Sequence, residues 1–141
     1  MIMKQEDRQL LLKDLSARLP YGVIVDYKEN EFEIPHWKIN VIYPETMDGW
    51  IGYDEKVGVG SKSGSRPFNI GEYKPYLRTM SSMTEEEKKE LGRISCEGNI
   101  EHKYGIFYKS QDYLNSIHVD YRGLISKGLA IEVTKENNPY K

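Results

Sequence analysis

The side chains that could do chemistry in this chain are few and do not cluster along the sequence. There are three histidines, His36, His102 and His118, and one cysteine, Cys96. A metal site needs several ligands at short spacings, and the one short pair, His118 with Asp120, does not define such a site. A Cys–His nucleophile would need Cys96 activated beside His102, and nothing nearby in the sequence predicts that activation. We therefore expect no metal, no cofactor and no catalytic residue.

A second candidate is the basic segment of residues 56–78, which carries five cations and one carboxylate and so has a local net charge of +4. Cations interleaved with aromatic side chains are typical of surfaces that bind nucleic acid. The candidate binding residues of this segment are Lys62, Arg66, Lys74 and Arg78. The overall net charge of −2 argues against this function, because no general basic field attracts a polyanion.

The glycines and serines of residues 58–67 could surround a phosphate with backbone N–H groups. Their spacing matches neither a Walker loop nor a dinucleotide loop, so we expect a solvated hairpin loop here. Arg122 is a further candidate, because its guanidinium could bind a phosphate or a carboxylate in a fork. The favoured alternative is that Asp120 caps a helix and Arg122 makes an internal salt bridge.

Aromatic content is the more suggestive feature, with eleven tyrosines and two tryptophans, many of them on the faces of predicted strands. Tyrosines on an exposed sheet face could stack on bases or sugars. Tyrosine is equally a normal filler of half-buried strands and a favoured residue of protein interfaces.

Length and composition indicate one soluble globular domain over residues 1–141, with a polar tail at 136–141 that we expect to fray. A single cysteine predicts a reducing compartment, and no apolar run approaches the length of a membrane span. Charges interrupt the first residues too often for a signal peptide. The expected location is therefore the cytoplasm, with no membrane partner.

Hydrophobic spacing predicts the elements of the N-terminal half. Leucines recur at helical spacing over residues 5–19, with the charged residues Asp14 and Arg18 expected off this apolar stripe, and Pro20 follows. Alternation predicts a strand at 21–27 and another that changes parity at Pro35, where we expect an edge position or a bulge. The faces of these strands are expected to carry Tyr21, Val23, Val25 and Tyr27, and then Trp37, Ile39, Val41 and Tyr43. Residues 51–59 are expected to form either one bent strand or two short strands.

The C-terminal half begins with a helix whose start is well marked. Thr84 and Glu87 have the spacing of a capping box, and acidic residues fill the first turn of the predicted helix, residues 84–93. Alternation over residues 100–108 predicts a strand. One face of this strand is expected to carry Ile100, His102, Tyr104, Ile106 and Tyr108. Short helices are expected after Ser110 or Asp112 and over 121–127, and then a short strand over 129–133.

These elements predict an α+β fold with an N-terminal helix, a mainly antiparallel sheet of four to six strands and short helices in the C-terminal half. Three blocks of the chain, residues 8–23, 74–91 and 113–132, together about two-fifths of it, also resemble a family of small uncharacterised proteins from gut Bacteroides and related bacteria. In that family the second and third blocks read KPYLRPMSSMTEEE and HFDYRGLIEKGLA. This chain differs at Thr79 and Val119. The resemblance implies no activity; it suggests an origin in phage or mobile elements.

The sequence leaves three functions open. The first is a non-catalytic cytoplasmic adaptor that binds another protein, which the aromatic content and the lack of a catalytic constellation favour. The second is nucleic-acid binding through residues 56–78. The third is an enzyme whose site is assembled only in the fold, for which a deep pocket with two or more perturbed titratable groups would be the sign. A homodimer is also open, through a sheet edge near Pro35.

Overall fold

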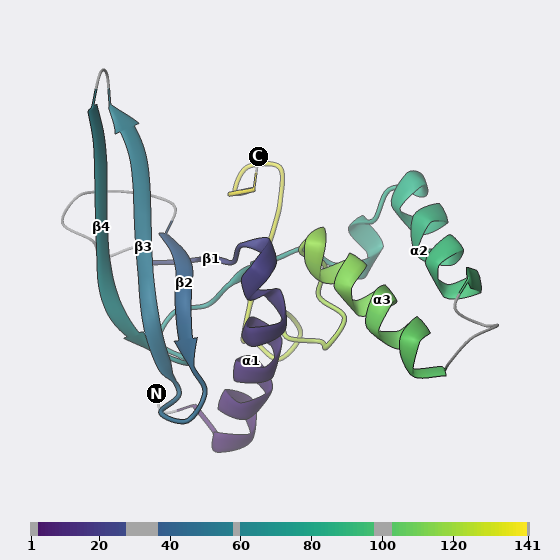
Figure 1. The fold of residues 1–141 in the computed structure, drawn as a ribbon, viewed down its shortest axis with the longest axis horizontal. Coiled ribbons are helices and arrows are strands. Elements are labelled where there is room, and N and C mark those ends of the chain that lie inside the picture. Colours follow the sequence, from purple (N-terminus) through teal and green to yellow (C-terminus); the bar gives the residue numbers. More distant parts are fainter. Residues whose placement is uncertain (1–2, 28–36, 58–59, 98–102, 141) are drawn as a thin grey trace.

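The computed structural model of the protein describes residues 3–27, 37–57, 60–97 and 103–140, with side chains for all of these except residues 54–57, 60–62, 95–97 and 103–108. The region around Pro35 and the first two residues of the expected hairpin loop, 58–59, lie outside the described residues. Figure 1 shows a four-stranded sheet on one side of the N-terminal helix α1, and a pair of helices, α2 and α3, on its other side. This arrangement confirms the predicted α+β fold.

Helix α1 spans Gln5–Arg18 and passes into a short 3-10 helix, η1, at Leu19–Tyr21. The α-helical hydrogen bonding ends where Pro20 supplies no N–H, as its position predicts. Leu11 and Leu15 on one face of α1 are almost completely buried against the sheet. The apolar stripe read from the sequence therefore packs into the core.

The main sheet is an antiparallel meander in the order β1-β2-β3-β4. Its strands are β1 Ile24–Val25, β2 Trp37–Tyr43, β3 Asp48–Val57 and β4 Gly60–Asn69. The predicted strand at 21–27 is much shorter than expected, because Tyr21 belongs to η1, although Val23, Val25 and Tyr27 share the buried face as predicted.

The expected flexible loop at residues 58–67 is wrong over most of its length, because residues from Gly60 onward form β4. The ten residues of β4 pair in unbroken register with the ten of β3. Gly64 shows why a glycine-rich segment can be a strand here: a Cβ at this position would lie 2.7 Å from Cε1 of Tyr53. The absence of a side chain at Gly64 gives the Tyr53 ring its place.

The core lies between α1 and the inner face of the sheet. Its fully buried members come from every layer: Leu11, Leu15, Val23, Val25, Ile39, Ile51, Phe68, Ile70, Leu77 and Leu124. Three edge-on aromatic contacts extend it, with Tyr27 against Trp37 and Tyr73, and Trp37 against Tyr53. Burial of this apolar surface is the main force holding the sheet to α1.

Beyond the sheet, a second small sheet joins β5, Tyr76–Leu77, in parallel to β6, Ile131–Glu132. A one-turn helix η2, Met80–Ser82, then leads to α2, Glu85–Glu97. The predicted capping box is confirmed, since the Glu87 N–H donates to Thr84 Oγ1 at 3.1 Å and the Thr84 N–H donates to Glu87 Oε1 at 2.8 Å. The N-terminus of α2 is therefore fixed by its own sequence.

The predicted strand at residues 100–108 is wrong over 103–108, because α3 spans Lys103–Ser116 without a break, and residues 100–102 lie outside the described residues. The two-residue alternation of this segment favours a strand, but the tertiary contacts of α3 override this local preference. Tyr113, Leu114 and Ile117, at or just beyond the end of α3, pack with Met83 and Val119 in a second apolar cluster. The expected helix start at Ser110 or Asp112 is therefore interior to α3.

The expected helix over residues 121–127 is also wrong, since this segment forms turns. Asp120 therefore caps no helix, but its carboxylate stabilises these turns by accepting the N–H groups of Leu124 at 3.0 Å and Ile125 at 2.9 Å. Gly128 ends the turns at a φ of 75°, a conformation that favours glycine. No helix among the described residues is long and apolar enough to cross a membrane.

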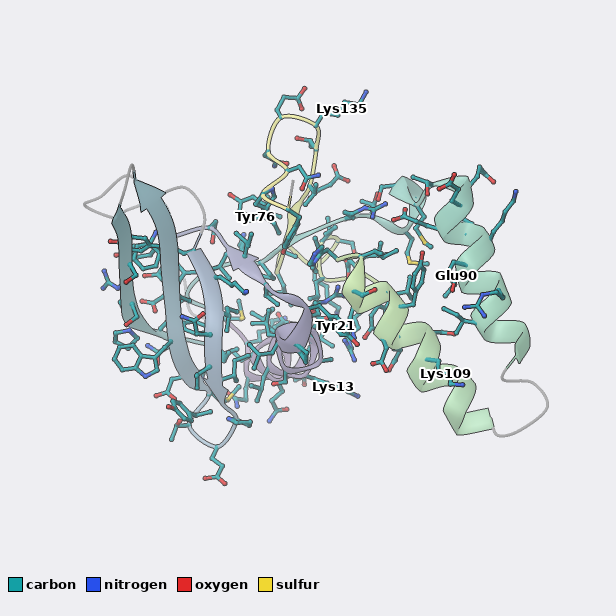
Figure 2. The ribbon with its side chains drawn as sticks, turned by 45° about the horizontal axis from the view of Figure 1, so that its top comes forward. Lys13, Tyr21, Tyr76, Glu90, Lys109 and Lys135 are labelled. Atoms are coloured by element: carbon teal, nitrogen blue, oxygen red, sulfur yellow. The ribbon has the colours of Figure 1, made fainter. Side chains whose placement is uncertain are left out.

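The C-terminal segment does not fray as far as the structure describes it. Pro139 is buried, and the Tyr140 hydroxyl accepts the Ile24 N–H at 3.2 Å and donates to the Tyr76 carbonyl at 2.7 Å. Figure 2 shows Tyr76 at the base of the C-terminal loop that carries Lys135 near its tip. The tyrosine thus ties the tail to both sheets.

Candidate functional site

A β-bulge in β2 creates an exposed aromatic surface on the outer face of the sheet. The pairing of β2 with β3 shifts between Ile39 and Val41, so that one extra residue interrupts the alternation. Ile39 therefore points into the core, whereas Val41 and Tyr43 point outward with 37% and 50% of their surface exposed. The predicted common face of Trp37, Ile39, Val41 and Tyr43 is wrong for its last two members, because the bulge reverses the parity.

Strand β3 completes this surface. Trp50 lies directly opposite Val41 in the ladder and is 41% exposed. Pro67, also exposed, lies opposite Trp50 on β4. We call Val41, Tyr43, Trp50 and Pro67 the sheet-face patch. Its members carry no charge and stand on three adjacent strands whose inner face is packed into the core, so the patch is held rigidly.

A second cluster of interest is buried where α1 meets the segment after α3. Asp14 accepts a hydrogen bond from Arg18 Nε at 2.7 Å and one from Arg122 Nη1 at 2.8 Å. Arg18 also donates through Nη2 to the Val119 carbonyl at 2.8 Å. The side chains of Asp14 and Arg18 have no exposed surface. We call Asp14, Arg18 and Arg122 the charged junction.

The burial of the charged junction corrects the expectation that Asp14 and Arg18 lie away from the packed face of α1. The four-residue spacing of this acid and base was the signal in the sequence that could have predicted their pairing. The predicted internal salt bridge of Arg122 is confirmed. Both arginines also lie over the Tyr121 ring, 5.3 Å from its centroid for Arg18 and 4.6 Å for Arg122. The junction is therefore occupied by its own members.

Arg78 is engaged in the same way. Its guanidinium donates to both Glu87 carboxylate oxygens, at 2.8 and 2.6 Å, and to the Ile117 carbonyl at 3.2 Å. It also bonds the hydroxyl and the carbonyl of Ser82. The Arg78 hydrogen bonds, with those from Thr84, lower the pKa of Glu87 to about 2. Arg78 thus joins β5, η2, α2 and the end of α3.

Of the candidate binding residues in the basic segment, Arg66 and Lys74 are exposed and Arg78 is held in an internal ion pair. Arg66 lies over the Tyr27 ring, 4.9 Å from the centroid, and donates to its hydroxyl. Arg122 is held in an internal ion pair as well. The side chain of Lys62 lies outside the described residues.

Of the histidines, only His118 falls within the described residues. Its ring stacks on Tyr140 with the centroids 3.6 Å apart. Burial, with the nearby charges of Arg18 and Arg78, lowers the pKa of His118 to about 4, so the ring is neutral at pH 7. Among the described residues no group of three metal-ligating side chains occurs. The Cys96 and His102 side chains lie outside that part of the chain.

A surface pocket with a volume of about 270 Å³ adjoins Tyr140. Its lining consists of Tyr21, Gly22, Ile24, Lys38, Pro139 and Tyr140. We call it the Tyr140 pocket. Burial raises the pKa of Tyr140 to about 12, so its hydroxyl stays protonated and continues to donate to Tyr76. Sequence reasoning missed this pocket, because it assigned Tyr140 to a frayed tail and Tyr21 to a strand.

Comparison with protein-family models, curated proteins and solved structures found no match for the chain. The function must therefore be argued from the surfaces themselves. The three blocks behind the resemblance described above do meet in space: Arg18 from the first bonds Val119 of the third, and Arg78 of the second bonds Ile117 of the third. Their meeting point is an internal junction, so the similar residues need not form a binding site.

Proposed function

We propose that this protein is a non-catalytic binding module that holds another protein against the sheet-face patch. The observation that carries the proposal is the pair of large aromatic side chains, Tyr43 and Trp50, exposed on the outer face of a rigid sheet. A contiguous exposed apolar patch on a folded protein marks an interaction surface, whereas single exposed apolar side chains do not. Tryptophan and tyrosine are also the residues that contribute most to binding energy at protein interfaces.

The bulge adds support, because it turns Val41 and Tyr43 to the outer face at a cost in regular pairing. If residues 39–43 alternated regularly, without the bulge, Val41 and Tyr43 would lie on the same face as Ile39 and point into the core. Bulges commonly redirect side chains next to functional sites.

The chemistry of the patch favours a protein partner over a nucleic acid. Its four members are uncharged, so they neutralise no phosphate, which is the main source of affinity for nucleic acids. Arg66 and Arg78, from the basic segment, are held by Tyr27 and Glu87. An apolar groove on another protein is the surface that complements Val41, Tyr43 and Trp50.

The enzyme alternative has less support. The sign expected for it was a deep pocket with two or more perturbed titratable groups. The Tyr140 pocket contains one such group, the Tyr140 hydroxyl, which is fully occupied by Ile24 and Tyr76. A hydroxyl held in this way is a structural group rather than a free acid or base.

The test is affinity capture from native lysate with the full chain as bait, with and without nuclease, followed by binding measurements on the purified partner. We expect Trp50→Ser to weaken binding by at least about ten-fold, the effect of losing an interface hot spot. Met80→Ser is the matched control, because Met80 is 45% exposed but lies outside the patch. Circular dichroism checks that both variants fold.

Three results would overturn the proposal. Binding that ignores Trp50→Ser would place the contact elsewhere. Material that nuclease removes would move the function to the nucleic-acid alternative. A dimer in size-exclusion chromatography that Trp50→Ser dissociates would make a second copy of this chain the occupant of the patch.

A further inference from the structure

The Tyr140 pocket has features of a binding site that the sheet-face patch does not use. Lys38 is an exposed lysine of β2, and among the residues that the structure describes no carboxylate lies within ion-pair distance of its ammonium group. It is also the one charged side chain in the pocket lining. An anionic group in the pocket would therefore meet a cation that has no competing partner in this part of the chain.

The walls of the pocket are apolar and fixed. The Tyr140 ring is held on one face by the stacked His118 and at its hydroxyl by Ile24 and Tyr76. Tyr21, 39% exposed, and the buried Pro139 provide further apolar surface. A preformed apolar wall with one polar group at its rim is the usual composition of a small-ligand site.

Gly22 brings the Lys38 side chain to this position. Its φ of 84° is a left-handed conformation that favours glycine, and it turns the chain from η1 into the β1 strand. A Cβ at Gly22 would lie 3.4 Å from Lys38 Cε and 3.8 Å from Nζ. The lysine stem therefore lies along the bare backbone of Gly22, with its ammonium group at the pocket.

We infer that the Tyr140 pocket binds a carboxylate-bearing apolar group about the size of one amino-acid residue. The carboxylate lies at Lys38, and the apolar part lies against Tyr21 and Tyr140. The volume of about 270 Å³ is just below the range of pockets for drug-sized molecules, which limits the ligand to a small group. This site is separate from the sheet-face patch and does not depend on the function proposed above.

Two sources can supply such a group: a free small carboxylate, or the chain end of a partner that also crosses the sheet. The second is considered because Lys38 pairs with Gly52, two residues from Trp50, and so shares the outer face of the sheet with the patch. The chemistry that the pocket recognises is the same in both cases.

The test is an NMR titration of the full-length, isotope-labelled protein with N-acetylphenylalanine, with its neutral amide as the matched ligand. We expect amide signals of Gly22, Ile24, Lys38 and Tyr140 to shift, with a dissociation constant of about 1 mM or tighter. The neutral amide should bind about ten-fold more weakly, because it makes no charge-assisted bond to the ammonium. Lys38→Met, which keeps the aliphatic stem, should have the same effect.

Lys13→Met is the control variant, because Lys13 is an exposed lysine on α1 that is not part of the pocket (Figure 2). It should bind the acid like the unchanged protein, and so should Trp50→Ser, even if the protein-binding proposal fails. Equal binding of acid and amide, or no shift of these four signals at about 10 mM ligand, would overturn the inference.

An acetylated tetrapeptide that ends in the same phenylalanine separates the two sources. If it binds more tightly than N-acetylphenylalanine and Trp50→Ser removes the gain, the pocket binds the chain end of a partner. If it binds no more tightly, the ligand is a free small carboxylate. Either result supports the pocket, whereas loss of all binding on extending the ligand would contradict a partner chain end and leave the free carboxylate as the ligand.

Discussion

The charged junction and the sheet-face patch are opposite departures from the usual distribution of residues. Asp14 and Arg18 are charged and completely buried, whereas Tyr43 and Trp50 are large, partly apolar and exposed. In the junction, each charge has its partner within the chain, at 2.7 to 2.8 Å. In the patch, the side chains stand on a rigid sheet, and their exposure shows that the described residues do not cover them.

This contrast shows where to look for function. A buried polar group and an exposed apolar patch are both informative, but the first can be explained by the fold alone when its partners are present. The junction bonds α1 to the segment after α3 through its ion pairs, although Arg18 Nη1 is buried without a hydrogen-bond partner among the described residues. The patch has no comparable explanation within the described chain, so it is the better candidate for an interaction surface.

The largest effect that tests this contrast is expected from Asp14→Ala. The change would leave the Arg18 guanidinium buried without a counter-charge, and breaking a buried ion pair in this way costs about 3–5 kcal/mol. Urea denaturation measures the loss, and Lys13→Ala, next in sequence but exposed, should stay within about 0.5 kcal/mol of the unchanged protein.

A variant that does not fold would leave the size of the effect unmeasured, so a second variant is needed. Asp14→Leu combined with Arg18→Met replaces the pair by apolar groups and should recover part of the stability. If Asp14→Ala alone costs less than about 1 kcal/mol, the junction is not the internal support described here.

The next largest effect separates the two faces of one strand. Ile51 and Trp50 are neighbours in β3, but Ile51 is completely buried and Trp50 is 41% exposed. Ile51→Ala should cost about 2–5 kcal/mol through the cavity it leaves. Trp50→Ser should cost less than about 1 kcal/mol, because its losses are limited to contacts along the outer face. Thermal and urea unfolding measure both, and equal losses would mean that Trp50 supports the fold rather than binding.

The sequence predicted the parts of the fold that depend on local signals. The capping box of Thr84 and Glu87 and the apolar stripe of α1 both follow from spacing over a few residues. The backbone hydrogen bonds of Asp120 and the left-handed Gly128 follow from residue type alone. Such features are determined by the backbone chemistry of a single segment.

The missed parts depend on contacts between distant segments. The orientation of Tyr43 depends on a bulge that only the pairing of β2 with β3 creates, and no residue type in β2 marks it. Helix α3 replaced a strand because its end packs with Met83 from before α2. The Tyr140 pocket joins residues more than 100 positions apart in sequence, such as Ile24 and Tyr140. Periodicity within one segment cannot contain that information.

The smallest predicted effect concerns Arg78 and Glu87. About a fifth of each side chain is exposed, so this ion pair lies between the buried charged junction and the exposed sheet-face patch. The hydrogen bonds from Arg78 lower the pKa of Glu87 to about 2 from an ordinary 4.5, so its stabilising contribution is complete above pH 4.5 and is lost as the pH falls toward 2. Glu87→Gln should therefore be less stable at pH 7 by about 2 kcal/mol, and the difference should vanish near pH 2. Urea denaturation across this range measures the difference.

Glu86→Gln is the control, because Glu86 is an exposed neighbour in the same first turn, and it should show no such convergence. A Glu87→Gln difference that stays constant with pH would mean that the ion pair with Arg78 is not the source of the stability.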